Sequence, residues 1–280
     1  MKDFPDLFKE DLGREDRINM EPIVIDLVDN HRDIQVFHPT TGAEVPAYMD
    51  KAAEKELQRM LNAGMLEPIS GYCENLSRGF FVEKPGKDSV KARLVADFRG
   101  INRKLRRPEH PLDGSWGILK RLNPHDKYFA AVDFSSGFSQ LPLAEKSRHL
   151  FNIILPLGKY RYCVLPQGLN VSPELFDINT AEEIRNTPGI WKNADDVLGG
   201  GRKLEELDER MRRIFSVCRK RGIKLSPSKL QCGIRIKWGR VIVESVGPLG
   251  EGQSDVKISP DEQKVRDFIE KRLLLRRNVK

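Results

Sequence analysis

The sequence predicts an α+β fold built around an antiparallel sheet. Its 280 residues are about twice a typical domain length, so one large domain or two subdomains is expected. Hydrophobic residues make up 39% of the chain, which is enough for a core. Strand-like runs occur in hairpin pairs and are mixed with helical segments rather than ordered in regular βαβ units, and this pattern favours the α+β class.

The first half of the chain predicts an arm, a helix and a hairpin. Residues 1–48 mix Pro, Asp and short apolar patches, as expected of an extended, partly strand-like arm. Residues 49–62 carry apolar side chains at helical spacing, and Gly64 follows as a stop signal. Residues 80–83 and 92–97 flank a polar turn that contains Pro85 and Gly86, which predicts two paired strands.

The second half alternates strands with two helices. Residues 128–134 predict a buried strand that contains an acid, and residues 151–156 and 160–165 predict a second hairpin. Ser172 is the expected N-cap of a helix, with Pro173 at its first position. Residues 204–221 form the clearest helix, with Gly222 as its C-terminal stop. A strand over 236–244 and a helical fragment over 268–275 complete the prediction.

Charge and cysteine usage narrow the class of protein. Lys and Arg total 48 against 41 Asp and Glu, a net charge of +7 that indicates an anionic partner, nucleic acid first and a membrane surface second. No apolar run approaches the roughly 18 residues of a membrane span, and no secretory signal is visible. The four cysteines lack metal-ligand spacing, so we expect reduced thiols and a cytoplasmic or nuclear protein.

Three carboxylates stand out. Asp133 comes near the end of the predicted buried strand, and Asp195 and Asp196 are adjacent, at a predicted turn. Clustered carboxylates repel one another unless a cation neutralises them, and oxygen-rich clusters suit Mg²⁺ and phosphoryl transfer. A solvated Asp-Asp turn is the plainer alternative. The five histidines show no ligand spacing and are expected to be structural or at the surface.

Basic residues surround these acids. Nine Lys or Arg and two acids occur between Lys84 and Arg107, and thirteen Lys or Arg against four acids occur between Arg202 and Arg240. Such a frame suits a phosphate backbone, although helices also carry Lys and Arg on solvated faces.

Six segments, in order, resemble the reverse transcriptases of LTR retrotransposons of the gypsy type, and the resemblance runs from about residue 4 to 268. The segments are VADFRGIN at 95–102, FAAVDFSSGFSQ at 129–140, LPQGL at 165–169 followed by Ser172, Pro173 and Phe176, ADDVL at 194–198, RGIKLSPSK at 221–229, and ISPDEQKV at 258–265. Residues 49–70 are similar to the helix and I-E-P segment that opens the family's domain.

The resemblance implies the fingers and palm of a polymerase right hand. Residues 1–48 would form an arm leading into the fingers, 49–106 and 142–171 the fingers, 107–141 and 172–257 the palm, and 258–280 the truncated start of a thumb or connection. The implied partners are an RNA or DNA template with its primer and dNTPs, with no membrane, in a retroelement particle. The oligomeric state is left open.

The resemblance also implies the site. Asp133, Asp195 and Asp196 would be catalytic and would bind two Mg²⁺ ions, with Mn²⁺ as a substitute, and the backbone carbonyl of Phe134 would complete one metal site. Phe138 would stack beneath the sugar and exclude a 2′-hydroxyl. The other nucleotide-binding residues would be Lys84, Lys87, Arg93, Ser136, Gly137, Gln167 and Gly168, and the template-binding residues would be Arg99 and Asn102. The choice between Lys84 and Lys87 for the triphosphate stays open.

Three functions are compatible with the sequence. The leading one is an RNA-directed DNA polymerase domain of a retroelement Pol polyprotein. The second is a degenerate remnant that binds nucleic acid without polymerising, and the third is a non-enzymatic interaction scaffold. Asn193 and Ala194 replace the usual aromatic and variable residues before Asp195, and three glycines at 199–201 replace an apolar strand and are expected to loosen the hairpin.

Overall fold

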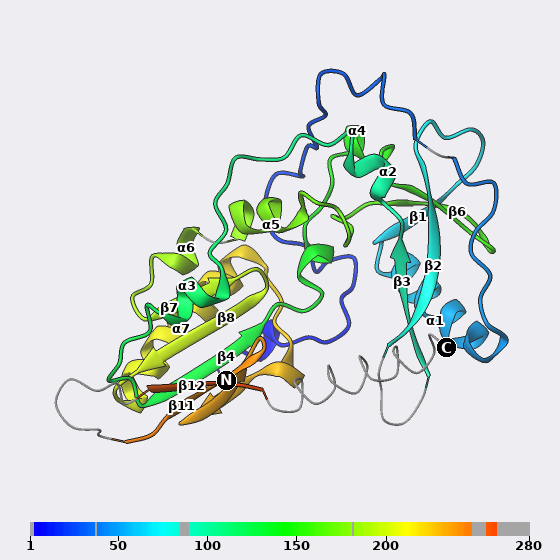
Figure 1. The fold of residues 1–280 in the computed structure, drawn as a ribbon. Helices are drawn as coiled ribbons and strands as arrows, with labels where there is room; N and C mark the ends of the chain where they lie inside the picture. Colours follow the sequence, from blue (N-terminus) through cyan, green and yellow to red (C-terminus); the bar gives the residue numbers. More distant parts are fainter. Residues whose placement is uncertain (1–2, 37, 85–89, 181, 248–255, 262–280) are drawn as a thin grey trace, which may run out of the picture.

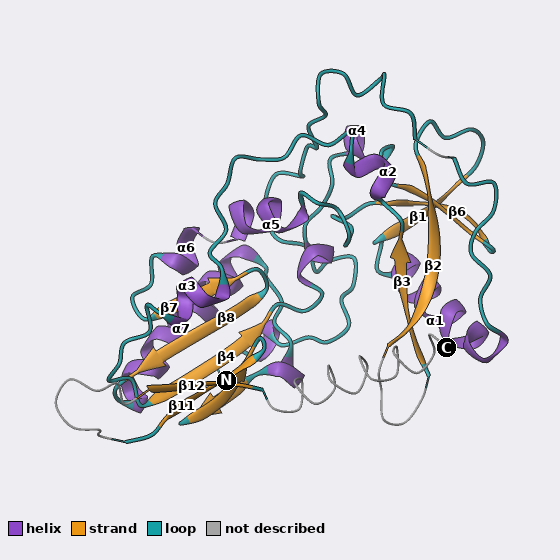
Figure 2. Ribbon diagram, in the orientation of Figure 1, coloured by secondary structure: helices purple, strands orange, loops and turns teal. Residues whose placement is uncertain are grey.

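The computed structural model describes residues 3–36, 38–84, 90–180, 182–247 and 256–261. Within these residues, two sheet-containing regions lie at opposite ends of the molecule and are joined by loops and short helices (Figures 1 and 2). The mixture of antiparallel sheets and helices confirms the predicted α+β class.

One region holds a five-stranded sheet over the described residues, in the order β1-β6-β5-β2-β3. Its strands are β1 (Leu66–Ile69), β2 (Leu76–Lys84), β3 (Lys91–Ala96), β5 (Asn152–Leu155) and β6 (Gly158–Tyr162). Both predicted hairpins, β2–β3 and β5–β6, are present. Because β2 and β5 pair in parallel, this sheet is mixed. Helix α1 (Asp50–Asn62) lies beside this sheet and buries Ala53, Leu57 and Met60, which recur at helical spacing.

The other region holds an antiparallel sheet of four described strands in the order β7-β8-β4-β9. Its strands are β4 (Tyr128–Asp133), β7 (Ile190–Asn193), β8 (Asp196–Gly201) and β9 (Gln231–Gly233). Alternate residues of β4 serve two cores: Ala130 and Val132 belong to the main core, and Phe129 and Ala131 belong to a second one. Both faces of β4 are therefore buried, which explains its continuous apolar sequence.

Helix α7 (Leu204–Arg221) covers this sheet and has the predicted bounds. Its buried side chains are Leu207, Met211, Ile214, Phe215 and Cys218. Gly222 ends the helix with φ of 70°, a left-handed conformation that glycine adopts without steric cost.

The three glycines of β8 do not loosen the hairpin as expected. Gly199, Gly200 and Gly201 are buried and pair in register with β4, opposite Ala130, Phe129 and Tyr128. A Cβ on Gly201 would lie 2.9 Å from the backbone nitrogen of Leu207, so the absence of side chains lets α7 approach the strand closely.

The predicted strand over 236–244 was wrong. Residues in this range form a hairpin of β10 (Arg235–Trp238) and β11 (Val241–Ser245), which turns at Gly239 with φ of 58°. β12 (Val256–Pro260) pairs with β11, and the predicted palm boundary at 257 falls inside it. The predicted helix over 268–275 lies outside the described residues.

The remaining helices are short. They are α2 (Arg99–Asn102), α3 (Ser115–Leu119), α4 (Glu145–Arg148), α5 (Ser172–Thr180) and α6 (Glu182–Arg185), with 3-10 turns at Pro5–Leu7, Ala47–Met49, Gly137–Gln140 and Pro227–Lys229. The predicted N-cap role of Ser172 was wrong, because α5 begins at Ser172 itself, and its hydroxyl donates to the carbonyl of Pro166. All four cysteines are free thiols, and no described helix has the length and apolar character of a membrane span.

The N-terminal arm contacts both regions. Isolated β-bridges pair Phe8 with Leu225 on one side, and Ile23 with Leu143 and Leu27 with Leu105 on the other. Asp6 accepts a hydrogen bond from Arg219 Nε of α7 at 3.0 Å. The arm is therefore part of the folded core rather than an appendage.

A buried carboxyl lies beneath the glycine strand. Asp126 is 1% exposed, and neither of its carboxyl oxygens has a hydrogen-bond partner among the described residues. An ideal Cβ on Gly200 would stand 2.3 Å from Asp126 Oδ2, so Gly200 makes room for this side chain. Burial raises the pKa of Asp126 to about 6.

We expect Asp126→Asn to stabilise the protein at pH 8 by about 2 kcal/mol, and this gain should vanish near pH 4. The pKa of the folded state lies above that of the unfolded state, so the cost of burying the carboxylate is absent below the unfolded pKa and complete above about pH 6. Urea unfolding of both proteins between pH 4 and 8 measures the difference. A difference that does not change with pH would contradict the prediction.

Candidate active site

Asp133 and Asp196 lie directly opposite each other in the β4–β8 pairing. Asp195 lies in the tight turn between β7 and β8, which Asn193 and Asp196 close as a cross-strand pair. The backbone nitrogen of Phe134 donates to the carbonyl of Asp195 at 3.0 Å. The structure therefore brings the three predicted acids together at one end of a two-strand ladder.

The backbone is strained next to these acids. Among the described residues, Ser136 and Ala194 are the only non-glycine positions with positive φ, at 44° and 51°. Ser136 follows Asp133 by three residues, and Ala194 directly precedes Asp195. Such conformations cost about 1–3 kcal/mol each and tend to occur at functional sites.

Burial and mutual repulsion raise the pKa values of Asp195 and Asp196. Burial raises the pKa of Asp195, and the neighbouring charge of Asp133 raises it further. Burial also raises the pKa of Asp196, which shares a hydrogen bond with the Asp133 carboxyl and is repelled by both acids. The three acids together therefore form a site where a cation would be strongly favoured.

Lys229 provides a positive charge at this site. Its ammonium forms an ion pair with Asp133 Oδ2. Burial would lower the pKa of Lys229, but the hydrogen bond to Asp133 and the charges of Asp195 and Asp196 raise it overall. No sequence pattern singles out Lys229, although it ends the RGIKLSPSK segment at 221–229.

The oxygen atoms of the three acids and of the Phe134 carbonyl are of the type that binds a hard divalent cation. Across the described ranges, no three His, Cys, Asp or Glu side chains are arranged to hold a metal ion as they stand, and Asp133 is paired with Lys229. The backbone nitrogen of Ser226 donates to the carbonyl of Asp133. The carbonyl of Phe134 accepts no hydrogen bond among the described residues. Carboxylate and carbonyl oxygens are the ligands that Mg²⁺ prefers, so the residues fit such an ion once Lys229 moves away.

Phe138 and Gly137 lie beside the acids. The half-buried Phe138 ring packs edge-on against Phe176 of α5, with ring centroids 5.2 Å apart. A Cβ on Gly137 would lie 3.0 Å from the Phe176 ring and 3.3 Å from Cβ of Asp195. Glycine at position 137 therefore lets this turn pack closely against both α5 and the acidic turn.

The predicted triphosphate contacts belong to the β2–β3 hairpin. Arg93 is exposed on β3 opposite Val82, and Lys84 ends β2 opposite Lys91. Lys87 lies outside the described residues. The choice between Lys84 and Lys87 therefore stays open.

Gln167 and Gly168 are exposed in the loop before α5. A Cβ on Gly168 would touch the carbonyl of Ala96 and the ring of Phe98, both at 3.7 Å, so this loop lies against the end of β3. Asn102 Nδ2 donates to the Gly168 carbonyl at 3.0 Å, and its Oδ1 accepts from the backbone of Asn170. The Asn102 side chain therefore fastens the loop, a structural function that the sequence did not suggest.

Arg99 is the more accessible of the two predicted template residues. Its side chain is 89% exposed, and its Nε donates to Asp97 at 2.8 Å. An exposed ion pair of this kind contributes little to stability, so the guanidinium can exchange partners readily.

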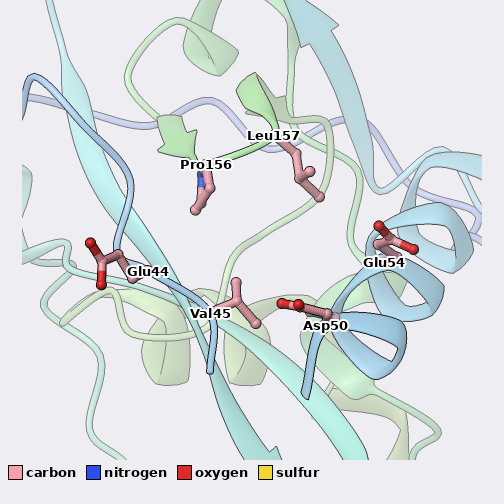
Figure 3. Close-up of a pocket in the computed structure, with 7 residues that line it drawn as sticks. Glu44, Val45, Asp50, Glu54, Pro156 and Leu157 are labelled. Atoms are coloured by element: carbon pink, nitrogen blue, oxygen red, sulfur yellow. The ribbon is translucent and has the colours of Figure 1, made fainter. Parts of the chain in front are cut away.

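A cavity of about 320 Å³ lies away from these residues, between α1 and the β5–β6 turn (Figure 3). It is lined by Glu44, Val45, Asp50, Ala53, Glu54, Pro156 and Leu157. Three carboxylates and no basic side chain line it, so it is unsuited to a phosphate-bearing ligand.

Comparison with known proteins points to one family. The family model described as reverse transcriptase (RNA-dependent DNA polymerase) matches residues 82–258, which is more than half of the chain. The Pol polyprotein of transposon 412 from Drosophila melanogaster is 29% identical over 276 residues, 94% of this chain and 22% of that protein. The Pol polyprotein of transposon gypsy from the same organism is 30% identical over 51% of this chain and 14% of its own length.

Solved structures share the fold. The foamy viral protease-reverse transcriptase in complex with dsDNA matches with a TM-score of 0.75 and 20% identity, over 89% of this chain and 51% of that one. Its complex with an RNA/DNA hybrid matches with a TM-score of 0.73, over 89% of this chain and 33% of the other. The chain thus spans about half or less of each of these relatives.

Proposed function

This chain belongs to the reverse transcriptase (RNA-dependent DNA polymerase) family, and from that premise we propose that it is of the gypsy type and polymerises DNA on an RNA or DNA template. The observation that carries the proposal is the register of β4 and β8. It places Asp133 opposite Asp196, with Asp195 in the adjoining turn, inside the segment that the family model matches.

The reaction is nucleotidyl transfer. The primer 3′-oxygen forms a bond to the α-phosphorus of a dNTP, the bond between that phosphorus and the bridging oxygen to the β-phosphate breaks, pyrophosphate leaves, and the hydroxyl proton passes to solvent. Bound divalent ions would neutralise charge on the triphosphate and favour ionisation of the 3′-hydroxyl. Asp133, Asp195, Asp196 and the Phe134 carbonyl would hold the two ions.

The other residues would position the substrates. Arg93, with Lys84 or Lys87, would bind the triphosphate, and Ser136, Gly137, Gln167 and Gly168 would line the nucleotide pocket. Arg99 would contact the template, and Asn102 would support it by holding the 168–170 loop. Phosphoryl transfer depends mainly on such positioning and on charge neutralisation.

The proposed partners are a primer–template and dNTPs. The foamy viral relatives were solved with dsDNA and with an RNA/DNA hybrid, and the net charge of +7 suits a phosphate backbone. Primer extension on an RNA template with Mg²⁺ or Mn²⁺ tests the proposal. Template-dependent products support it, and their absence with both ions overturns it.

Phe138→Val should raise ribonucleotide incorporation relative to deoxynucleotide incorporation by about tenfold or more. The ring is proposed to stand beneath the sugar and to exclude a 2′-hydroxyl by steric overlap. Competing dNTP and rNTP extension measures the ratio. Phe129→Val, which truncates a fully buried phenylalanine of β4, is the matched control and should destabilise the fold without changing the ratio.

A second candidate is nucleic-acid binding without polymerisation. The ion pair between Lys229 and Asp133 favours it, because the ammonium already neutralises part of the acidic cluster. Salt-dependent binding of primer–template with no extension at any metal concentration would select this candidate.

A further inference from the structure

A buried ionic cluster lies behind the proposed nucleotide pocket. Asp177 of α5 is 1% exposed, and its carboxylate is surrounded by His110 Nε2 at 2.8 Å, Arg185 Nη2 at 2.5 Å and Lys192 Nζ at 3.1 Å. The side chain of Lys192, on β7, is entirely buried. A buried ion pair is seldom more stabilising than apolar residues of the same size, so its presence calls for another explanation.

Lys192 contacts the aromatic residues of the site. Its ammonium lies 4.8 Å from the centre of the Phe176 ring and 5.9 Å from that of Phe134. Phe176 packs in turn against Phe138, with ring centroids 5.2 Å apart and planes at 68°. A continuous series of contacts therefore runs from Asp177 through Lys192 and Phe176 to Phe138.

Each contact in this series restricts the next. Asp177 keeps two further polar partners, so its carboxylate is fixed independently of Lys192. A cation over a ring face is attracted to the centre of the ring, and the attraction is stronger when both are desolvated. The fully buried Phe176 ring is thereby held in one place, where it forms the support on which Phe138 rests.

We propose that the Asp177–Lys192 pair is a positioning element which fixes Phe176, and through it Phe138, and so sets the discrimination between deoxyribose and ribose in the incoming nucleotide. The inference rests on the proposed function, because it requires Phe138 to stand beneath the sugar. In this arrangement neither Asp177 nor Lys192 touches the substrate.

The test measures nucleotide affinity separately from chemistry. Dissociation constants for dATP and ATP are measured with Mg²⁺ on a dideoxy-terminated primer–template, for the wild type, Lys192→Met and Asp177→Asn. Lys104→Met is the matched control, because Lys104 is a buried lysine of the other region that contacts Asn75. We expect both test variants to lower the ratio of the ATP dissociation constant to the dATP dissociation constant by about fivefold, with dATP affinity nearly unchanged. The Lys104→Met control should leave this ratio unchanged.

Two further variants separate positioning from general destabilisation. Lys192→Arg keeps the charge over the ring and should restore most of the discrimination. Combining Phe176→Leu with Lys192→Met should reduce discrimination no further than Phe176→Leu alone, because both act through one ring. If Lys192→Met does not fold, Asp177→Asn, which keeps the shape of the side chain, carries the test.

The outcomes distinguish this inference from the proposed function. Equal losses of dATP and ATP affinity, additive effects with Phe176→Leu, or a wild type that does not discriminate would overturn the inference. A wild type that discriminates in binding but does not extend a normal primer would overturn the proposed function and leave the inference standing.

Discussion

Primer extension by the Asp195→Asn variant is expected to fall by about a thousandfold or more relative to the wild type. The substitution keeps the shape of the side chain and removes the negative charge that is proposed to hold a cation. Single-nucleotide addition at saturating dNTP and Mg²⁺ measures the effect. Asp208→Asn, which removes an exposed acid of α7, is the matched control and should extend as the wild type does.

The same variant should not lose stability when metal is absent. Burial raises the pKa of Asp195, so an ionised carboxylate there costs free energy at neutral pH that an amide avoids. The free energy of unfolding in EDTA should therefore be equal to or higher than that of the wild type. Loss of activity together with loss of stability would instead indicate that Asp195 serves the fold, and wild-type extension by this variant would remove the proposed site.

Gly201→Ala should lower the free energy of unfolding by about 2–3 kcal/mol, because an added methyl group overpacks a rigid contact. The new Cβ would lie 2.9 Å from the backbone nitrogen of Leu207 and 3.1 Å from the carbonyl of Lys203. Backbone atoms at a helix start cannot move aside as the end of a flexible side chain can, so α7 would have to shift.

Urea unfolding measures the loss, and Gly117→Ala provides its control. Gly117 lies on the exposed face of α3 with no atom near its would-be Cβ, so alanine there should be neutral or slightly stabilising. Equal effects at the two positions would show that α7 does not rest on the glycine strand.

Local signals explain what could be predicted from the sequence. The helix of residues 204–221 and its stop at Gly222 follow from apolar spacing and one left-handed residue, and β4 follows from its apolar run. The turn that carries Asp195 was predicted from the adjacent acids and the motif around them. The partnership of Asp133 with Asp196, however, is a matter of strand register, which no local pattern specifies.

The features that were missed depend on contacts between distant segments. Lys192 occupies an inward position of β7 because Asp177, fifteen residues earlier, provides a buried carboxylate. Lys229 reaches Asp133 across 96 residues of sequence. β2 pairs in parallel with β5 only because the chain returns through the other region. A lysine in a strand usually marks a face that is exposed to solvent, so the local sequence does not predict that Lys192 is buried. Its partner from a distant segment explains the burial.

The N-terminal arm has a consequence for how the chain acquires its structure. Residues 8, 23 and 27 are synthesised well before their partners, which are residues 225, 143 and 105 respectively. Until residue 225 has left the ribosome, the arm cannot close over α7, and the apolar surface that it later covers stays accessible to solvent and to other chains. Contacts of such long sequence separation slow folding, so we expect docking of the arm to be a late step, during which the nascent chain is most dependent on chaperones.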